Sequence, residues 1–493
     1  MNKALRLLVL VLAVAMLLPA VVACDGGKTD DPSATTTGNV VNTEDPYETQ
    51  LPTIDWDEDT FFVLGRDGGT YTQFNNFEIS RETMDGDVVG DAVWTRNEAL
   101  RKKYNFLVDH ELVTNPASDA LTLYDAQDDV YDLVIYKSNQ VFTHASSGYL
   151  LDLNTVMYIN FDHPTWNADI NSELTVGGKL YASTSQFLLQ DKARTYTLFY
   201  NRELARDYDM GYLEDHVDAN TWTLEKFEEV SRKLTFDIDG GGAGDQADSF
   251  GVAAESYGSF VALVYGAGFR FGANDGETIS LRGSDSSTLN AMNNVITAVG
   301  KVWFDKTVLC EPQMFEVYDP ESPTDIFCDE RSLFFSSFPS AFDTGLNKKC
   351  TFEFGVVPFP KIDANQERYY NYMNISNDSI FAIPYTVADP AQVGFYLQAI
   401  SEEACKTSYT AYIESKCKVQ DSYDELTAKM LDMSFKCVTY DVVCMLNPGS
   451  IYSIIVSDIP FFNTNVFVRL YQNKGTAPAD KLDELIAKFE ANG

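Results

Sequence analysis

TFFVLGRDGG, residues 60–69, decides the fold class of this 493-residue chain. The run is rich in apolar and aromatic side chains and ends in charged and glycine residues, which predicts a buried strand followed by a turn. Further strands are expected at 106–113 and 131–138. Residues 91–106, between the first and second of these strands, predict a helix, because four apolar side chains lie near one helical face. They are Val93, Trp94, Leu100 and Tyr104. This alternation indicates an α/β lobe with a largely parallel sheet.

The rest of the chain predicts a second set of such elements. Strands are expected at 178–184, 196–204, 332–342, 352–361 and 379–386, and helices at 221–235, 389–400 and 477–493. Thr223 is the expected N-cap of the helix at 221–235. Roughly 440 residues are too many for one ordinary hydrophobic core. We therefore expect two α/β lobes, with the chain crossing between them near 180–200 and 360–385.

The N-terminus has the pattern of an export signal. Lys3 and Arg6 precede an apolar run at 7–18, which is too short to span a bilayer because that takes roughly 20 apolar residues. The following VVAC, which ends at Cys24, resembles a bacterial lipobox. The resemblance implies a lipoprotein signal peptide at 1–23 and a Cys24 that carries acyl chains such as palmitate. An ordinary signal peptide or a weak anchor remains open.

Residues 24–56 are polar and have no apolar period, so we expect a disordered tether. The chain carries 73 acidic and 36 basic residues, a net charge of −37. Such a charge repels nucleic acid and anionic lipid, so neither is an expected partner. Seven cysteines follow Cys24, an odd number without a CxxC pair. Some disulfide bonding and free buried thiols are both compatible with this count, and the spacing gives no support to a zinc site.

Five segments occur in a fixed order within residues 58–405. They are LFYNRELARDY (198–208), TWTLEKFEEVSRKLT (221–235), FVALVYGAGFRFGANDGETISL (260–281), FGVVPFPK (354–361) and FAIPYTVADPAQVGFYLQAIS (381–401). Together they resemble the carbohydrate-binding, family 1-like extracellular solute-binding proteins of ABC importers. The resemblance implies a type II-like, two-lobed periplasmic-binding-protein fold with several hinge crossovers and a ligand held between the lobes.

That resemblance also implies the domain limits. The N-lobe is expected to comprise 57–180 and 376–435, and the C-lobe 185–375 and 436–490. The chain departs from the pattern at FFSSFPSAF (334–342), where many sugar binders carry a tryptophan and this sequence has none. An aromatic platform from elsewhere, or a ligand that is not a typical sugar, would account for the difference.

Candidate binding residues follow from the rule that ligands of open α/β sheets lie beyond the carboxyl ends of the strands. The first strand is followed by a glycine pair and polar side chains, and the third by KSNQ, although both stretches are also compatible with a turn or a helix cap. The candidates in the N-lobe are Asp67, Tyr71, Asn75, Lys137, Ser138 and Asn139.

Further candidates lie near the expected crossings and in the C-lobe. Tyrosines and asparagines at 369–374 suit a sugar, because an aromatic ring packs on its C–H face and amides pair with its hydroxyls. A buried core tyrosine or a simple hairpin is the competing interpretation. These candidates are Asp191, Tyr200, Ser337, Phe338, Tyr372 and Asn374.

One loop, DIDGGGAGDQAD at 237–248, resembles a degraded calcium loop. The ligand candidates are Asp237, Asp239, Asp245 and Asp248, but position 5 is glycine and position 12 is aspartate instead of glutamate. We therefore expect no metal or cofactor in the main function and keep calcium as a weak candidate beside a plain surface loop.

The sequence favours a binding protein over an enzyme. The four histidines, His110, His144, His163 and His216, are scattered, and no GxSxG, P-loop or HExxH motif occurs. The expected function is capture of a small solute, most simply a sugar or oligosaccharide, by a monomer tethered outside a bacterial cytoplasmic membrane. Its partners would be two ABC permease subunits driven by a cytoplasmic ATPase. A glycan-active hydrolase and a sensing module remain alternatives. Peptide, polyol and uronate ligands also remain open, and Lys137 and Arg194 would favour an acidic sugar.

Overall fold

In the computed structural model of the chain, the described residues belong to one compact unit that begins at Pro46. The predicted leader, Cys24 and the first part of the tether lie outside the described residues. Among the described residues, no helix has the length and apolar character needed to cross a membrane. The structure describes residues 46–241, 247–305, 307–310, 322–343, 345–419, 422–462 and 466–492.

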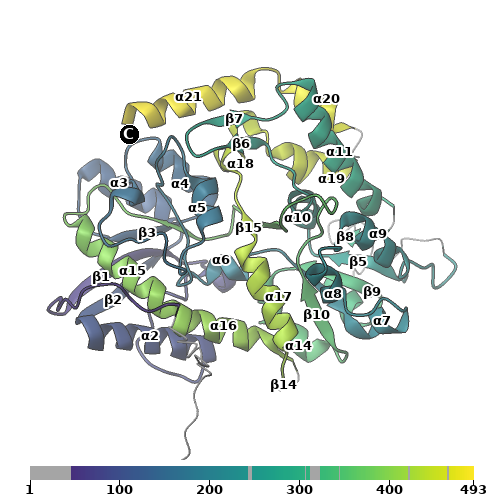
Figure 1. The fold of residues 1–493 in the computed structure, drawn as a ribbon, viewed down its shortest axis with the longest axis horizontal. Helices are drawn as coiled ribbons and strands as arrows, with labels where there is room; N and C mark the ends of the chain where they lie inside the picture. Colours follow the sequence, from purple (N-terminus) through teal and green to yellow (C-terminus); the bar gives the residue numbers. More distant parts are fainter. Residues whose placement is uncertain are drawn as a thin grey trace, which may run out of the picture. The chain divides into compact units, whose positions relative to one another are not determined.

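The first lobe, called the N-lobe here, is built on a four-stranded sheet of order β12-β3-β1-β2 (Figure 1). β1 pairs in parallel with β2 and β3, while β12 is antiparallel to β3. The three strands predicted at 60–67, 106–113 and 131–138 are therefore confirmed. The strands are β1 (Asp59–Arg66), β2 (Phe106–Val113), β3 (Leu133–Tyr136) and β12 (Ile380–Ala382). The main helices are α2 (Val88–Tyr104), α3 (Pro116–Ala126), α4 (Ser138–Ala145) and α15 (Pro390–Lys406).

The second lobe, the C-lobe, is built on a five-stranded mixed sheet of order β10-β4-β9-β5-β8. β4 runs antiparallel to both β9 and β10, whereas β5 runs parallel to β8 and β9. The strands are β4 (Thr197–Asn201), β5 (Phe250–Ala254), β8 (Val308–Cys310), β9 (Ser332–Ser337) and β10 (Phe354–Val357). The main helices are α9 (Leu224–Arg232), α10 (Gly258–Gly266) and α11 (Ser286–Trp303).

Local sequence signals set the helix ends. The Thr223 side chain accepts a hydrogen bond from the Lys226 amide and caps α9, as the sequence predicts. Asp389 caps α15 in the same way, with Pro390 at its first position. These side chains satisfy amides that no carbonyl of the helix can reach. Both helices therefore begin where the sequence indicates.

One expected strand does not form. Residues 178–184 make only two isolated bridges, Val176 with Lys179 and Ser183 with Phe381. Gly177 and Gly178 both have positive φ and turn the chain back on itself. The Leu180 amide is satisfied by the Asp152 side chain at 3.0 Å instead of by a neighbouring strand. Residues 180–184 are continuously buried in the lobe, and they do not pair as a strand of a sheet.

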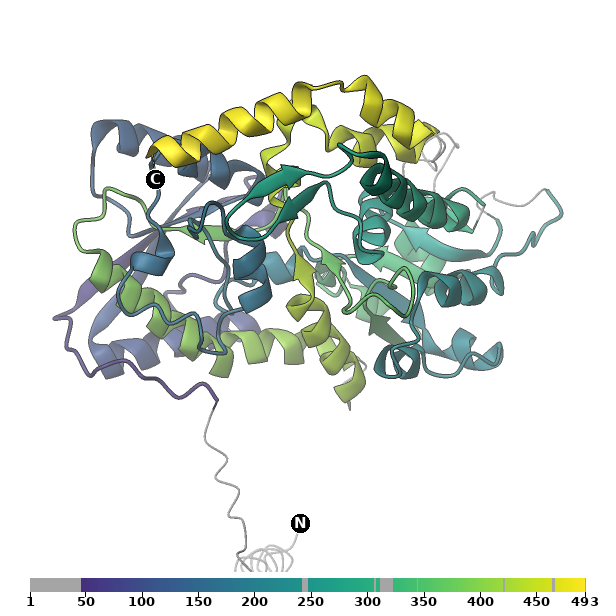
Figure 2. The same cartoon turned by 45° about the horizontal axis from the view of Figure 1, so that its top comes forward.

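The last quarter of the chain runs over both lobes. β15 (Val438–Thr439) pairs in parallel with β11 (Asn371–Tyr372). In the chain, β11 follows β10 of the C-lobe sheet and precedes β12 of the N-lobe sheet. α21 (Ala477–Asn492) extends along one side of both lobes (Figure 2). Its Phe489 ring packs 6.2 Å from Phe142 and 5.8 Å from Tyr181 in the N-lobe. The C-terminal helix is confirmed, and the lobe limits expected from the sequence remain predictions.

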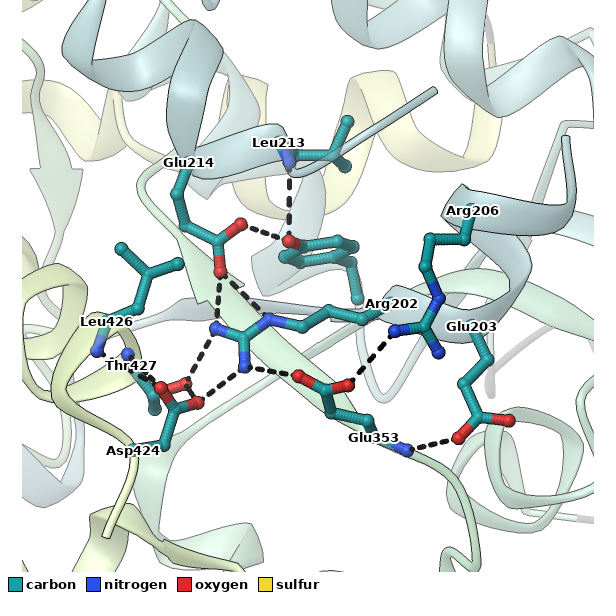
Figure 3. A network of polar contacts seen from close by, with 10 residues as sticks. Arg202, Glu203, Arg206, Leu213, Glu214, Glu353, Asp424, Leu426 and Thr427 are labelled. Carbon is teal, nitrogen blue, oxygen red and sulfur yellow. Dashed lines mark hydrogen bonds and ion pairs between the residues drawn. The ribbon is translucent and has the colours of Figure 1, made fainter. Parts of the chain in front are cut away.

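A buried ionic network centres on Arg202, the residue just after β4 (Figure 3). Its guanidinium lies 2.6 Å from Glu214, 2.5 Å from Asp424 and 3.2 Å from Glu353. Asp424 also caps α17 (Glu425–Lys436). The network therefore joins β4, α8 (Leu213–Asp218), β10 and α17 into one packed unit.

Cysteine pairing is mixed. Cys328 and Cys350 form a disulfide that links α13 (Pro323–Cys328) to the end of α14 (Leu346–Lys349). Cys405, Cys437 and Cys444 are free thiols, and burial raises their pKa values. The sequence left disulfide bonding and free buried thiols open, and these five cysteines show both.

Candidate functional site

The carboxyl ends of β1 and β3 hold polar side chains at the edge of the N-lobe sheet. In the loop after β1, the Asp67 side chain accepts from the Gly69 amide at 2.8 Å, and the Asn75 side chain accepts from the Gly68 amide. A Cβ on Gly68 would lie 2.1 Å from the Tyr71 carbonyl oxygen, so the turn requires glycine. Tyr71 itself is 63% exposed. Asp67 and Asn75 thus hold the loop in shape, and Tyr71 is open to a ligand.

The three candidates after β3 are arranged around Asp378. The Ser138 amide at the start of α4 donates to Asp378 Oδ1 at 2.9 Å. The Lys137 ammonium is half-buried, and burial lowers its pKa, with the positive charge of Arg66 acting in the same direction. Asn139 is exposed, and its amide donates to the Ile375 carbonyl at 3.2 Å. These residues therefore meet the segment that leads from the C-lobe back into β12.

Aromatic rings from the C-lobe and the crossing segments pack together in one stack-like group. The Tyr196 ring lies 4.3 Å from Phe338 and 5.7 Å from Tyr372, and Tyr372 lies 5.3 Å from Tyr265. The Tyr372 hydroxyl is hydrogen-bonded to the Tyr452 hydroxyl. Phe338 is partly exposed, whereas Tyr372 is buried. Phe338 is therefore the member of this stack that presents a face to a ligand.

Arg66, the last residue of β1, is buried beside the loop that follows it. Its Nε donates to the Phe74 carbonyl at 3.0 Å and its Nη2 to the Asn377 carbonyl at 2.8 Å. Its guanidinium also lies 5.7 Å from the centre of the Phe74 ring. The Nη1 atom is buried and has no hydrogen-bond partner.

Arg194 connects the two lobes. It lies just before β4, and its guanidinium is 4.4 Å from the Phe74 ring of the N-lobe and 5.6 Å from the Phe338 ring of the C-lobe. Its Nη2 donates to the Gln73 carbonyl at 2.6 Å and its Nη1 to Ser340 Oγ at 3.3 Å. Its Nε is buried without a partner. We call the following residues the interlobe cluster: Arg66, Phe74, Lys137, Ser138, Arg194, Phe338 and Asp378.

Asp378 is the buried carboxyl group of this cluster. Burial raises its pKa to about 7, and the neighbouring Asp191 acts in the same direction, while the Ser138 amide and Arg66 oppose the shift. Its Oδ2 atom has no hydrogen-bond partner. The Ser138 and Tyr440 hydroxyls lie close together, and neither makes a hydrogen bond of normal geometry. Buried polar atoms without partners are unusual in a structural core.

Other sequence candidates lie in different surroundings. Tyr200 is completely buried in the C-lobe, and its hydroxyl donates to Glu214 of the Arg202 network. Asp191 is buried against Lys192 at 2.6 Å. Ser337 is buried at the end of β9, and the half-buried Asn374 accepts from the Ser376 amide at 3.2 Å. Tyr200 and Asp191 therefore have internal partners and present no exposed surface in this conformation.

The acidic loop after α9 gathers three of its four candidate ligands. Carboxylate oxygens of Asp237, Asp239 and Asp248 lie within 4.8 Å of one another. Each carboxylate also accepts a backbone amide of the same loop. The fourth candidate, Asp245, lies outside the described residues. Because the carboxylates already serve the turn, calcium binding here stays a prediction.

Sequence reasoning did not single out Arg66, Phe74 or Asp378 as part of a site. A charged residue at the end of an otherwise apolar strand, such as Arg66, is a sequence signal that could have indicated a binding-site residue. Asp378 stands immediately before a short apolar strand and could be noticed in the same way. Phe74 has no such signal, since its role depends on the two arginines that contact its ring.

A cavity of about 470 Å³ lies elsewhere, between α10, α11 and the segment before β11. Its lining includes Phe269, Arg270, Met292 and Tyr370. Of the tyrosines and asparagines at 369–374, Tyr370 lines this cavity, whereas none of the twelve binding candidates predicted from the sequence does. The interlobe cluster is therefore the place where predicted residues and unpartnered buried polar atoms coincide.

Comparison with solved structures identifies the fold. The chain is similar to a cyclo/maltodextrin-binding protein complexed with maltotetraose, with 15% identity and a TM-score of 0.51, covering 88% of this chain and 97% of that one. The fold is that of the two-lobed periplasmic binding proteins. The sugar-binding protein MalE from Xanthomonas citri shares this periplasmic-binding-protein fold, with 12% identity, a TM-score of 0.52 and coverage of 88% and 98%. No protein-family model and no curated protein sequence matches the chain.

In a periplasmic-binding-protein fold the two sheets form separate lobes joined by crossing segments, and the interlobe cluster lies where these segments meet. The chain passes from one sheet to the other through the segment before β4 and through β11, and these two segments are neighbours, since the Tyr196 amide donates to the Tyr372 carbonyl at 3.1 Å. Hinge motion at such crossings changes the distance between the lobes. Residues on both sides of the cluster would therefore separate or approach as the lobes move.

Proposed function

We propose that this protein is an extracellular solute-binding protein that captures a small solute, most simply a sugar or oligosaccharide, for an ABC importer. The observation that carries the proposal is the periplasmic-binding-protein fold together with an aromatic and polar cluster between its lobes. Two solved proteins of the same fold are described as sugar-binding. The face of Phe338 would pack on the C–H face of a sugar ring, and polar side chains would pair with its hydroxyls.

Capture would proceed by lobe closure. In the open form, Phe74 and Tyr71 of the N-lobe separate from Phe338 of the C-lobe. A ligand that contacts both lobes stabilises the closed form by its extra interactions there. Closure also removes water from around the bound hydroxyl groups. The closed protein would then present both lobes to two permease subunits, which an ATPase in the cytoplasm drives.

Several parts of the proposal rest on sequence alone. We propose that Cys24 carries the lipid anchor and that residues 24–56 form the tether, which keeps a monomer at the outer face of a bacterial cytoplasmic membrane. Two acyl chains give firm anchoring because each buried methylene contributes about 0.8 kcal/mol. We also propose 57–180 with 376–435 as the N-lobe and 185–375 with 436–490 as the C-lobe.

Thermal unfolding of the full chain in the presence of a panel of oligosaccharides tests the proposal. A ligand at 100 times its dissociation constant stabilises the native state by about 2.7 kcal/mol, which raises the melting temperature measurably. Analysis of the same mixtures for cleaved glycan separates binding from hydrolysis. A panel that produces turnover would favour the exported hydrolase. A binding protein without a neighbouring pair of permease genes would favour the sensing module.

A further inference from the structure

Three cationic side chains gather in the interlobe cluster of a strongly acidic chain. Arg66 and Arg194 are each 5% exposed, and Lys137 is half-buried. The positive charge of Arg66 acts on both Lys137 and Arg194. With 36 basic residues against 73 acidic ones, such a concentration of like charge is not a consequence of composition.

None of these three cations has an ion-pair partner among the described residues. Arg66 and Arg194 donate to backbone carbonyls and to Ser340, which are neutral acceptors. Each guanidinium keeps one buried nitrogen without a hydrogen-bond partner, Nη1 in Arg66 and Nε in Arg194. A buried cation is unfavourable unless an anion compensates it. The two side chains therefore have hydrogen-bonding capacity that no described residue satisfies.

The carboxyl groups near these cations do not complete the charge balance. Glu255 and Asp343 act on the charge of Arg194 from beyond ion-pair distance, and Asp343 is paired with Lys416. Asp378 acts on Arg66 and Lys137, and burial favours its protonated form. Glu78 also acts on Arg66, but it is buried beside Arg96 and burial keeps its pKa raised. The described part of the cluster thus carries excess positive charge.

We propose that the solute captured between the lobes is an anionic carbohydrate, whose oxyanion takes the unpartnered N–H groups of Arg66 and Arg194. This inference rests on the proposed function and adds the charge class of the ligand. Guanidinium groups suit carboxylate and phosphate oxygens because their N–H groups form charge-assisted hydrogen bonds. Lys137 adds a further positive charge at the same edge. Phe74 positions both guanidinium groups against its ring.

Matched ligands test the inference by isothermal titration with the full chain. A panel of uronate oligosaccharides is measured as free acids and as methyl esters, which have the same rings without the charge. Sugar phosphates are measured beside the unphosphorylated sugars, so that carboxylate and phosphate sources are told apart. We expect at least one acidic ligand to bind 10-fold or more tightly than its neutral counterpart, and this preference to decrease as NaCl rises from 50 to 500 mM.

Substitutions in the interlobe cluster test whether its arginines cause the preference for acidic ligands. Arg194→Gln should remove most of the acid-to-ester ratio, while Arg194→Lys should keep part of it. Arg101→Gln is the control, because Arg101 is an exposed α2 side chain paired with Glu98. If neutral sugars bind as tightly as their acidic forms, the inference is wrong and the proposed function stands. If no carbohydrate of either kind binds, both are wrong. A ratio that persists in Arg194→Gln and also in Arg66→Gln would exclude the cluster as its source.

Discussion

Two buried arginines flank the same strand and have opposite surroundings. Arg202, just after β4, meets three carboxylates, of which Glu214 is completely buried (Figure 3). Arg194, just before β4, meets aromatic rings and neutral acceptors and keeps an unpartnered Nε. Both side chains are almost fully buried, so burial does not distinguish them.

The difference in partners distinguishes an arginine that stabilises the fold from an arginine that we propose binds a ligand. Glu214, Glu353 and Asp424 satisfy Arg202 within one packed network, which has no remaining capacity to bind anything else. Arg194 lies between Phe74 and Phe338, which belong to different lobes. A buried charge without a counter-charge persists when its function repays the cost in stability. The predictions below test this distinction, from the largest expected effect to the smallest.

The largest effect is expected from Arg202→Met. The substitution leaves Glu214 buried without its counter-charge, and breaking a buried pair costs about 3–5 kcal/mol. Urea unfolding of the variant and the wild type measures the loss. Arg206→Met is the control, because Arg206 contacts the same Glu353 at the surface and exposed pairs contribute about 0–1 kcal/mol. Equal losses in the two variants would contradict a special role for the buried network.

A pH effect of intermediate size is expected from Asp378. Its pKa rises from 3.8 to about 7 on folding. Between these values the folded protein holds a proton that the unfolded chain has lost, so stability decreases as pH rises from 4 to 7. The upper limit is about 4 kcal/mol, and we expect roughly half because a buried site relaxes.

Asp378→Asn should remove this part of the pH dependence. Two cationic groups act on Asp378, Arg66 and Lys137. The acidic groups that act on it are Asp191 and the Tyr440 hydroxyl. Glu78 and Asp132 also have raised pKa values, so the measured quantity is the difference between variant and wild type in urea unfolding at pH 4 and pH 7. Parallel curves would exclude Asp378 as the source.

Phe338→Ala should weaken ligand binding by about 1–2 kcal/mol if its ring packs on the sugar. Isothermal titration with the tightest ligand of the panel measures the change. Phe304→Ala, which removes an exposed aromatic ring of the C-lobe, provides the control. An unchanged affinity in Phe338→Ala would place the aromatic platform elsewhere in the cluster.

Tyr200→Phe should cost about 1 kcal/mol in stability and leave ligand affinity unchanged. The Tyr200 hydroxyl donates to Glu214 and accepts from the Leu213 amide at 3.3 Å, and loss of one such group is worth about 1 kcal/mol. Urea unfolding and titration together measure both parts. A loss of affinity without a loss of stability would return Tyr200 to the binding site that the sequence suggested.

The smallest effect on stability is expected from Arg194→Met, which should change the free energy of unfolding by less than about 1 kcal/mol. No carboxylate loses its counter-charge in this variant, and the apolar side chain fits between two aromatic rings. Urea unfolding beside Arg202→Met gives the direct comparison. Equal losses would mean that Arg194 is a structural residue, and the contrast between the two arginines would no longer hold.

Sequence patterns predicted where helices and strands form better than which residues these elements contact in the fold. β1, β2, α9 and α15 follow the apolar periodicity and caps at their own residues, because these signals are local. The strand expected at 178–184 does not form, because its apolar residues are buried without a neighbouring strand that pairs along the segment. Tyr200 and Phe338 are both aromatic residues at ends of C-lobe strands. Sequence alone gave no basis for separating the buried one from the partly exposed one.

By itself, the sequence determined the α/β class, two sets of strands and helices, and the strand ends after which polar side chains would meet. Only the tertiary structure decided which of those side chains have partners. Arg194 and Arg202 are the same residue type, eight positions apart, and their roles differ because charge compensation depends on residues far away in the chain. Glu353 and Asp424 reach Arg202 through folding, and no carboxylate reaches Arg194.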